Sequence, residues 1–432
     1  MSRTIVVVIR KTDTIIVGGG QAGLSLSYFM TRLGLRHAVL ERDRVGEQWR
    51  GRWDSLHLLT PNWLNRLHGA RPHANVEGFL PARDFSAYLR RYAGSFGAPL
   101  YERTGVRGIR HKKGVFEVET ERGGWRANNL VLATGYAAVP RLPAVSASAP
   151  RGLTQLHSSE YRSPAALPPG GILVVGAGPS GQQIAAELRR AGRDVVLAVG
   201  SHTRSLRRYR GRDIWHWLYA IGDLHRTIDE VDRGLVRRTP SLAVSGANGG
   251  EQLDLHVLAE LGVRVTGRLT GFDGTTVSFA DDLDESIVDA ELGMRATLDA
   301  IDEHIADVHP EWPHAVEPAA EVLIQSPPTA VDLAARPIGT VLWATGYGRD
   351  YGWLDVPHAV DRSGEILQRY GVSPVQGLYT IGLNFQRYRA SHFIGGVGAD
   401  ALMLARELAT TRRSRVRLQP RGVPLGFALA GA

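Results

Sequence analysis

Two glycine-rich segments of the chain share the spacing G-x-G-x-x-G. Their glycines are Gly18, Gly20 and Gly23 in the first copy, and Gly176, Gly178 and Gly181 in the second. In this spacing the first glycine permits a tight turn, the second lets the backbone approach a pyrophosphate, and the third lets a helix pack closely on a strand. N–H groups at the start of the following helix then point at the phosphates. Each segment therefore predicts a dinucleotide-binding turn.

The two copies differ in the residues that follow the second strand of each unit. Glu41 ends that strand in the first copy, where a carboxylate accepts hydrogen bonds from a ribose diol. The equivalent position in the second copy falls near 200–201, which has no carboxylate, and Arg204, Arg207 and Arg208 follow. Arginine pairs with a phosphate that a carboxylate would repel. We therefore expect FAD at the first site and NADPH at the second, with Arg204 as the best candidate for the 2′-phosphate. A solvated arginine face is the alternative.

Both glycine turns lie in the same order of elements: strand, turn, helix, strand. The expected ranges are 13–17, 22–33 and 37–40 for the first unit, and 172–175, 182–191 and 194–199 for the second. Apolar runs next to glycine turns and periodic helical segments are typical of Rossmann-type α/β folds. The fold class that we predict is therefore α/β, with two Rossmann-type dinucleotide-binding domains.

The chain between and after these units contains further recognisable elements. We expect a helix at 84–97 capped by Asp84, β-hairpins at 105–132, and a last helix at 398–412. Two segments with the sequence Ala-Thr-Gly-Tyr, 133–136 and 344–347, each end an apolar strand. Such small-residue turns let the chain cross between nucleotide domains with its backbone close to a cofactor. The aromatic residues of 209–219 are more typical of a core than of a substrate pocket.

Composition excludes several classes of function. The chain has no cysteine, so it has no disulfide, no thiolate metal site and no redox dithiol. Its net charge is +8, but the arginines are scattered and no nucleic-acid motif accompanies them, so we expect no nucleic-acid partner. The acidic run 281–285 lacks the spacing of a metal-binding loop, and we expect no metal. No apolar run approaches the ~18 residues of a membrane span, which predicts a cytoplasmic protein without a membrane partner.

Several ordered motifs together resemble the flavin-containing monooxygenases, which are class B flavoprotein monooxygenases of the NAD(P)/FAD-dependent oxidoreductase superfamily. The resemblance covers nearly the whole chain. It rests on both glycine turns, Glu41, both Ala-Thr-Gly-Tyr segments, and the segments Gln48-Trp49-Arg50, His157-Ser-Ser-Glu-Tyr161 and Gly382 to Asp400.

The resemblance implies an architecture like that of glutathione reductase, in which the NADPH domain is inserted into the FAD domain. The expected boundaries are 1–155 for the first part of the FAD domain, 156–330 for the NADPH domain with a substrate cap, and 331–432 for the second part of the FAD domain. The cofactors are FAD and NADPH. Besides the six glycines and Glu41, the implied cofactor-binding residues are Gln21, Ala22, Gln48, Trp49, Arg50, Thr134, Gly135, Pro179, Ser180, Ser201, Arg204, Thr345, Gly346, Gly382 and Gly396.

The activity that the resemblance implies is oxygenation of a small-molecule substrate with O2 and NADPH, through a flavin C4a-hydroperoxide. No catalytic side chain is assigned, although Thr60 and Asn62 are candidates near the flavin, and His157 is expected to link domains. Tyr161 stands where typical Baeyer–Villiger members have Trp, which favours oxygenation at nitrogen or sulfur. Leu153 stands where the family has a glycine, so a reductase or oxidase without oxygen insertion stays an alternative, as does a Baeyer–Villiger enzyme acting on a ketone. A homodimer is also left open.

Overall fold

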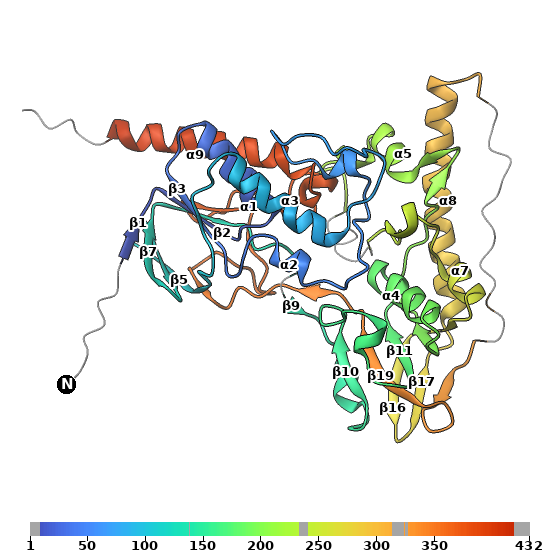
Figure 1. Ribbon diagram of the computed structural model, residues 1–432. Coiled ribbons are helices and arrows are strands. Elements are labelled where there is room, and N and C mark those ends of the chain that lie inside the picture. Colours follow the sequence, from blue (N-terminus) through green and yellow to red (C-terminus); the bar gives the residue numbers. More distant parts are fainter. Residues whose placement is uncertain (1–8, 138, 233–240, 313–323, 325–326, 419–432) are drawn as a thin grey trace, which may run out of the picture.

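The computed structural model describes residues 9–137, 139–232, 241–312, 324 and 327–418, with side chains as far as 411. The chain forms two α/β units that lie side by side, the first at the left of Figure 1 and the second at the lower right. Each unit contains one of the two glycine turns at the start of a helix, α1 or α4. The predicted fold class is therefore confirmed.

The first unit is built on a five-stranded parallel sheet in the order β22-β8-β2-β3-β4. Its strands are β2 (Thr14–Val17), β3 (His37–Leu40), β4 (Leu100–Tyr101), β8 (Asn129–Leu132) and β22 (Leu378–Thr380). Every residue of β2, β3 and β8 is buried, as expected for a parallel sheet that is covered on both faces.

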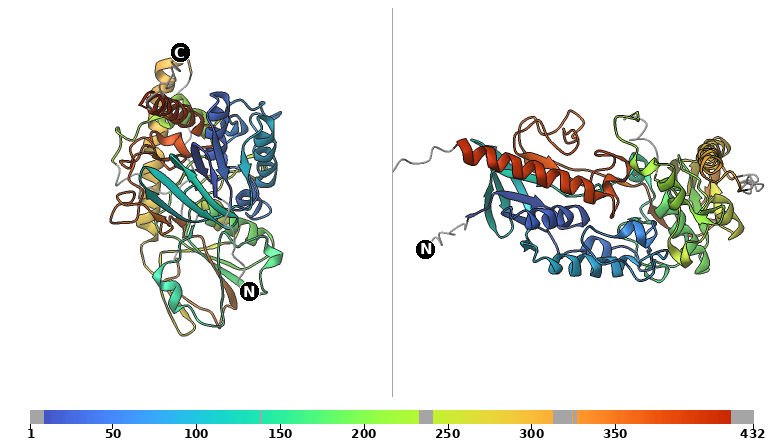
Figure 2. Two further views of the ribbon diagram at one scale, coloured as in Figure 1. Left: turned by 90° about the vertical axis from the view of Figure 1, so that its left-hand side faces the viewer. Right: turned by 90° about the horizontal axis from the view of Figure 1, so that it is seen from above.

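The two faces of this sheet are covered differently because side chains alternate along β2. Ile16 packs in one cluster with α1 (Gln21–Arg32) and α9 (Val397–Leu418), which lie alongside each other; Figure 2 shows this pair from above. Ile15 and Val17 pack in another cluster with a mixed sheet of order β1-β7-β6-β5-β21, in which the three central strands are antiparallel and the two edge strands pair in parallel. The strands of that sheet are β1 (Ile9–Lys11), β5 (Val106–Lys112), β6 (Val115–Thr120), β7 (Gly123–Ala127) and β21 (Leu354–Asp355).

The second unit repeats this plan with a parallel sheet in the order β10-β19-β11-β12-β15. Its strands are β10 (Thr154–His157), β11 (Gly171–Val175), β12 (Val195–Ala198), β15 (Arg264–Thr266) and β19 (Ile338–Trp343). Helices α4 (Pro179–Arg190) and α7 (Leu255–Glu260) belong to the cluster on one face. The other face packs on an antiparallel sheet of β16 (Leu269–Asp273), β17 (Thr276–Phe279) and β18 (Ala330–Asp332).

Strand pairing moves one expected domain boundary. The return to the first unit was expected after residue 330, but β18 and β19 both pair within the second unit. The chain therefore crosses back only after Trp343. Two short strands, β9 (Val139–Pro140) and β20 (Tyr347–Gly348), pair in antiparallel fashion where the chain crosses between the units. The Ala-Thr-Gly-Tyr segments lie next to these strands, as predicted.

Helix α3 (Ala82–Ser95) begins two residues earlier than the sequence suggested. Its N-cap is Pro81 and no side chain caps it, so the prediction that Asp84 is the N-cap was wrong. Asp84 lies in the first turn, where a carboxylate is favourable near the positive end of the helix dipole.

The remaining short elements are α2 (Glu47–Arg50), β13 (Arg208–Tyr209), β14 (Arg212–Asp213), η1 (Asn62–Asn65), η2 (Ala144–Ser148), η3 (Pro164–Ala166), η4 (Asp223–His225), η5 (Ala247–Gly249) and η6 (Arg389–His392).

A long helix, α8 (Leu283–Val308), stands at the edge of the second unit and packs on α5 (Ile214–Ala220). Its buried residues recur at helical spacing, from Ala290 through Ile305, so one stripe of the helix faces the core. The aromatic residues after the second glycine turn lie mostly in this cluster, as predicted: Tyr209, Trp215 and Trp217 are buried and Tyr219 is exposed.

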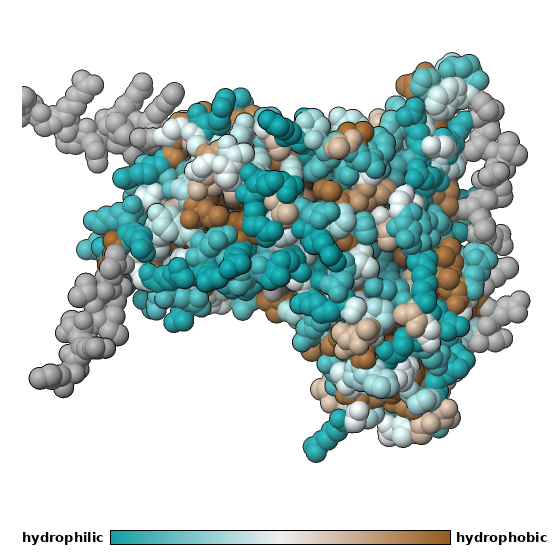
Figure 3. All heavy atoms as spheres, viewed as in Figure 1, coloured by the Kyte–Doolittle hydropathy of each residue, from teal (hydrophilic) through white to brown (hydrophobic). Residues whose placement is uncertain are grey.

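The surface is largely hydrophilic on the face drawn in Figure 3, where apolar side chains gather in small separate groups. Val288 and Leu292, one turn apart on α8, are among the exposed apolar residues. Among the described residues, no helix is both long enough and apolar enough to span a membrane.

We expect Trp343→Ala to destabilise the second unit. Trp343 is fully buried in the cluster between the two sheets, and its indole Nε1 donates to Gln155 at 3.0 Å. Removing a buried aromatic side chain of this size costs about 3–5 kcal/mol. Urea unfolding followed by circular dichroism measures the change, with Leu367→Ala, at a residue that is 38% exposed, as the control. An equal loss in both variants would contradict this assignment of the core.

Candidate functional site

The first glycine turn is held by backbone contacts that leave no room for side chains. A Cβ at Gly23 would lie 2.0 Å from the carbonyl oxygen of Gly18, and one at Gly18 would lie 2.5 Å from the carbonyl oxygen of Ala133. Gly18 also has a φ of +108°, which strongly favours glycine. The first Ala-Thr-Gly-Tyr segment is therefore packed directly on the turn.

The second turn repeats this geometry almost atom for atom. A Cβ at Gly181 would lie 1.8 Å from the carbonyl oxygen of Gly176, and one at Gly176 would lie 2.6 Å from the carbonyl oxygen of Ala344. The middle glycines are different, because no protein atom lies within 4 Å of a Cβ built on Gly20 or Gly178. The open side of each turn thus faces away from the protein, as required if a pyrophosphate is to approach the backbone there.

The residues predicted at each turn lie at the start of a helix. Gln21 and Ala22 begin α1, and Pro179 and Ser180 begin α4, where a helix start can receive a phosphate. Thr134 and Gly135 are half-buried in the first Ala-Thr-Gly-Tyr segment.

Strand register identifies the residue that follows the second strand in each unit. Val17 pairs with Leu40 in the first unit and Val175 pairs with Ala198 in the second. Glu41 therefore corresponds to Val199, one residue before the position near 200–201 that the sequence suggested. Val199 is fully buried and carries no carboxylate.

The Glu41 side chain is placed at the first glycine turn. Its Oε2 accepts a hydrogen bond from the Gly19 N–H at 2.7 Å, and its Oε1 accepts one from the Asp43 N–H at 3.0 Å. A carboxylate at this place suits a ribose diol, as in FAD, whereas the corresponding residue of the second unit, Val199, carries no charge. The open turns and this difference fit FAD in the first unit and NADPH in the second.

The arginines that follow β12 do not serve as the sequence suggested. Arg204 is 6% exposed, its Nε lies 3.3 Å from Asp254, and it also pairs with Glu291. Arg207 is 1% exposed and pairs with Asp213 at 2.6 Å. The interpretation of Arg204 as the ligand of the 2′-phosphate is therefore corrected, because its guanidinium is held by two carboxylates inside the protein. The sequence shows the charge of these residues but not their burial.

Ser201 and Arg208 remain at the surface near this position. Ser201 is exposed, and Arg208 is exposed and donates to the Gly249 carbonyl at 3.2 Å.

The junction between the units is built from both Ala-Thr-Gly-Tyr segments and two residues from elsewhere. The guanidinium of Arg52 lies over the ring of Tyr347 at 4.9 Å and donates to its hydroxyl. The His157 ring packs edge-on against the same tyrosine at 4.9 Å, and its Nε2 bonds the Gly346 carbonyl at 2.9 Å. Thr345 donates to the Arg141 carbonyl, which ties the second segment to the strand pair β9–β20. Sequence reasoning missed Arg52, although its place just after Trp49-Arg50 was a signal.

His157 ties β10 to the second Ala-Thr-Gly-Tyr segment. Its two ring nitrogens are bonded to the Gly346 carbonyl and to the Ser159 hydroxyl, and burial lowers its pKa. Its role as a domain-linking residue stays a prediction. Tyr161 is fully buried and donates to Glu187 of α4 at 3.0 Å, so it is part of the packing of the second unit.

Thr60 and Asn62, the two candidates near the flavin, are engaged within their own segment. Thr60 donates to Asn65 at 2.6 Å, and the Asn65 amide donates back to the Thr60 carbonyl at 2.7 Å. The Asn62 amide bridges the Asn75 carbonyl at 2.8 Å and the Leu80 N–H at 3.1 Å. Asn62 therefore holds the loop 75–80 in place. Sequence reasoning did not identify the fully buried Asn65 as the partner that fixes Thr60.

The Gln48-Trp49-Arg50 segment forms the short helix α2 beside the junction. The Gln48 amide donates to the Ala137 carbonyl at 3.0 Å, just after the first Ala-Thr-Gly-Tyr segment. Trp49 packs edge-on against Phe85 at 5.1 Å, and Arg50 pairs with Glu47 at the surface. Gln48 thus connects this segment to the junction, whereas Trp49 anchors it in the core.

The C-terminal glycines pack the start of α9 against the first unit. A Cβ at Gly382 would lie 2.6 Å from that of Ala22, and one at Gly396 would lie 2.1 Å from the Ala390 carbonyl oxygen. Asp400, in the first turn of α9, is 1% exposed. Burial raises the pKa of Asp400 to about 6, although Ser391 and Arg387 offset part of the shift.

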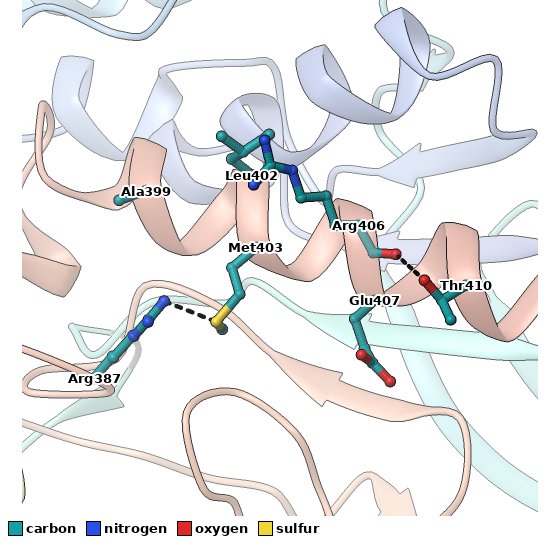
Figure 4. A pocket seen from close by; sticks show the side chains of 7 residues that line it. All are labelled: Arg387, Ala399, Leu402, Met403, Arg406, Glu407 and Thr410. Carbon is teal, nitrogen blue, oxygen red and sulfur yellow. Dashed lines mark hydrogen bonds between the residues drawn. The ribbon is translucent and has the colours of Figure 1, made fainter.

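A separate hollow of about 440 Å³ lies on the outer side of α9. Figure 4 shows its lining, in which Arg387 donates to the sulfur of Met403 at 2.8 Å and Arg406 and Glu407 stand on the helix. None of the residues predicted to bind a cofactor lines it, and we assign it no role. No group of His, Asp and Glu side chains in the described part of the chain is arranged to hold a metal ion.

Comparison with known proteins places this geometry in a family context. Residues 15–216 match the family model of pyridine nucleotide-disulphide oxidoreductases. An uncharacterized CzcO-like oxidoreductase of Geobacillus kaustophilus is 29% identical over 92% of this chain and 98% of its own length. An indole-3-pyruvate monooxygenase, YUCCA1 of Oryza sativa subsp. japonica, is 31% identical over 43% of this chain and 47% of its own length.

Solved structures share the whole fold at low sequence identity. A flavin-containing monooxygenase from Stenotrophomonas maltophilia superposes with a TM-score of 0.61 at 20% identity, over 93% of this chain and 99% of that one. Bacillithiol disulfide reductase from Staphylococcus aureus gives 0.59 at 13%, over 93% and 99%. OTEMO, in a complex with FAD and NADP, gives 0.56 at 15%, over 94% and 86%.

The fold and the paired glycine turns define a flavoprotein oxidoreductase with two dinucleotide-binding domains. The chain is an FAD- and NAD(P)-dependent oxidoreductase similar to the flavin-containing monooxygenases.

The glycines of the second turn allow a matched test of packing against ligand approach. Gly181→Ala should lower the melting temperature of the nucleotide-free protein, because its Cβ would overlap the Gly176 carbonyl, and overpacking of this kind costs about 1–3 kcal/mol or more. Gly178→Ala should leave that temperature almost unchanged yet weaken NADP⁺ binding at least tenfold, because its Cβ would stand where the pyrophosphate approaches. Thermal melts and calorimetric titration with NADP⁺ measure both. Unweakened NADP⁺ binding in Gly178→Ala would contradict the assignment of the open side.

Asp400 should make stability depend on pH in a defined direction. Its folded pKa of about 6 lies above the ordinary value of 3.8, so between these values the native state binds a proton that the unfolded state lacks. Its contribution to the free energy of unfolding therefore falls as pH rises from about 4 to about 6. Relative to the natural protein, Asp400→Asn should gain up to about 3 kcal/mol across this window. Urea unfolding of the flavin-free proteins at several pH values tests this, and a constant difference would contradict it.

Proposed function

We propose that this chain is an FAD- and NADPH-dependent monooxygenase that oxygenates a small molecule. The observation that supports it most is the shared junction of the two nucleotide sites. Each glycine turn packs on its own Ala-Thr-Gly-Tyr segment, and the strands β9 and β20 beside these segments pair with each other. Since ligands of such sheets bind at the carboxyl ends of the strands, both dinucleotides would meet at this junction.

The composition argues against one alternative activity for this fold, the reduction of a disulfide through a pair of cysteines in the enzyme. A flavoprotein that reduces a disulfide through its own dithiol needs two cysteines, and the chain has none. Electrons from NADPH would then pass to dioxygen or to an external acceptor. The monooxygenase reaction uses dioxygen and keeps one of its oxygen atoms in the product.

Bound FAD and NADPH would supply the hydride transfer and the activation of dioxygen. The chain would bind, orient and shield them. Glu41 would hold the ribose of FAD, the starts of α1 and α4 would hold the two pyrophosphates, and Arg52 with His157 would fix the segment that ends at Tyr347. Tyr136 is 46% exposed at the junction, with its ring packed edge-on against His392 at 5.5 Å. Burial lowers the pKa of His392 to about 4, so this imidazole would stay neutral beside the cofactors.

The substrate side of the junction would be closed by the cap formed by α5 and α8. The indole Nε1 of Trp215 donates to the Leu59 carbonyl of the first unit at 3.0 Å, and the Trp215 ring packs edge-on against Phe393 at 5.4 Å. Trp63 and Leu64 pack against the same cluster. The cap therefore contacts one segment that precedes the second unit in the sequence, at Leu59, and one that follows it, at Phe393. In this position it would exclude water from the reacting centre.

We propose nitrogen or sulfur as the atom that is oxygenated. Tyr161 replaces the Trp of typical Baeyer–Villiger enzymes, and it is buried under α4 with its hydroxyl on Glu187. Its influence would thus act through packing of the second unit, since it does not line the junction.

Oxygen-isotope labelling tests the proposed reaction. The FAD-loaded protein should consume NADPH and O2 and transfer one atom of ¹⁸O2 to a tertiary amine or a thioether, detected by mass spectrometry. A cyclic ketone serves as the comparison substrate. Release of hydrogen peroxide equal to the NADPH consumed, with no labelled product, would point to an oxidase. Labelled ester from the ketone alone would overturn the choice of nitrogen or sulfur.

A further inference from the structure

The second unit places a guanidinium from the segment after a neighbouring strand, β15, beside the position that corresponds to Glu41. After correction of Arg204, the second unit has no assigned cation for a 2′-phosphate. The guanidinium of Arg268, which follows β15, lies directly against Gly200, just after the Val199 that corresponds to Glu41. A Cβ built on Gly200 would lie 3.1 Å from Nη1 and 3.6 Å from Nη2 of Arg268.

We propose that Arg268 is the residue that binds the 2′-phosphate of NADPH and gives the second site its nucleotide preference. This inference rests on the proposed use of NADPH. The observation that supports it is the position of the Arg268 guanidinium. This group covers the backbone where the ribose of the second nucleotide would lie. In the first unit the same region faces the Glu41 carboxylate, so the two sites have opposite charge at corresponding places.

The neighbours of Arg268 hold its guanidinium in place through Nε and leave Nη1 and Nη2 available. Arg268 Nε lies 3.5 Å from Asp282 Oδ2, and the Arg268 N–H donates to Asp282 Oδ1 at 2.9 Å. Within the described residues, neither Nη1 nor Nη2 makes a hydrogen bond or an ion pair, and the side chain is 58% exposed. Asp282 thus orients the fork from one side and leaves the two terminal nitrogens for a bidentate contact with a phosphate.

The polar side chains of Ser286 and His202, which lie beside Gly200, are uncharged. The Ser286 hydroxyl donates to the Gly200 carbonyl at 2.7 Å and contacts His202 Nδ1 at 3.1 Å. Burial lowers the pKa of His202 to about 4, so it is neutral at physiological pH. Asp284 and Glu285 are exposed on the first turn of α8 and make the corner acidic apart from Arg268. Loss of Arg268 would therefore leave Gly200 with these uncharged and acidic side chains as its described neighbours.

Matched variants separate recognition of the phosphate from stability and general charge. Arg268→Ala removes the guanidinium. Arg264→Ala removes an exposed arginine from the opposite, amino end of β15, and Asp282→Asn removes the ion pair while keeping the guanidinium. Arg268→Lys keeps the charge without the fork.

Calorimetric titration of the FAD-loaded proteins with NADP⁺, NAD⁺ and 2′,5′-ADP measures recognition directly. For Arg268→Ala we expect NADP⁺ and 2′,5′-ADP to bind about 10- to 100-fold more weakly, as for loss of a charge-assisted hydrogen-bonding partner, and NAD⁺ to change less than about twofold. Arg268→Lys should be intermediate, and the variants at Arg264 and Asp282 should keep the preference for NADP⁺.

The outcomes distinguish this inference from the function on which it rests. An unaltered protein that binds neither nucleotide would overturn the proposed function. A natural protein that prefers NADP⁺, with an Arg268→Ala variant that keeps the preference, would overturn only the role of Arg268. Equal binding of NADP⁺ and NAD⁺ by the natural protein, or an Arg264→Ala loss as large as that of Arg268→Ala, would also overturn it.

Discussion

Each nucleotide turn depends on a contact between backbones that excludes any side chain. The third glycine of the turn sits on the carbonyl of the first, and the first sits on the alanine carbonyl of an Ala-Thr-Gly-Tyr segment. These contacts bring the ends of two strands and one helix within backbone distance, which requires glycine at these positions. The start of the helix is then held at a fixed place above the carboxyl ends of the strands. Because the same arrangement occurs twice, one constraint sets both binding surfaces.

The Ala-Thr-Gly-Tyr segments connect the two glycine turns to each other. Each packs on a glycine turn at one end, and the chain beyond it enters the strand pair β9–β20. Arg52 and His157 brace the second segment through Tyr347 and Gly346. The separation of the two nucleotide sites is therefore set by a short, continuously bonded path and not by the loose packing of two domains. A hydride transfer that needs the two rings in contact gains from such a path, because little reorganisation remains after binding.

The sequence was sufficient for those features whose physical cause is local. Glycine spacing, apolar runs and the acid at Glu41 follow from short stretches of chain, and the strands, helices and turns around them were predicted within a few residues. It was insufficient where burial or distant pairing decides. Arg204 looks like a surface cation in sequence, yet Asp254 and Glu291, which pair with it, come from elements far along the chain. The boundary expected at 330 failed for the same reason, because β19 pairs with β10 and β11 across a long separation.

Arg268 illustrates how the repeated fold can place opposite charges at corresponding positions. In the first unit the selective group is carried by the strand end itself, since Glu41 directly follows β3. In the second unit the corresponding residue is Val199, which is buried, and Gly200 leaves room for the side chain of Arg268 from the segment after β15, the next strand of the sheet. The side chain of Glu41 is short, so its residue must lie next to the ribose. An arginine side chain is long enough to reach the ribose from the segment after an adjacent strand. A cation for the second nucleotide is therefore free to come from a segment more than one element away, which a search along the loop after β12 would not find.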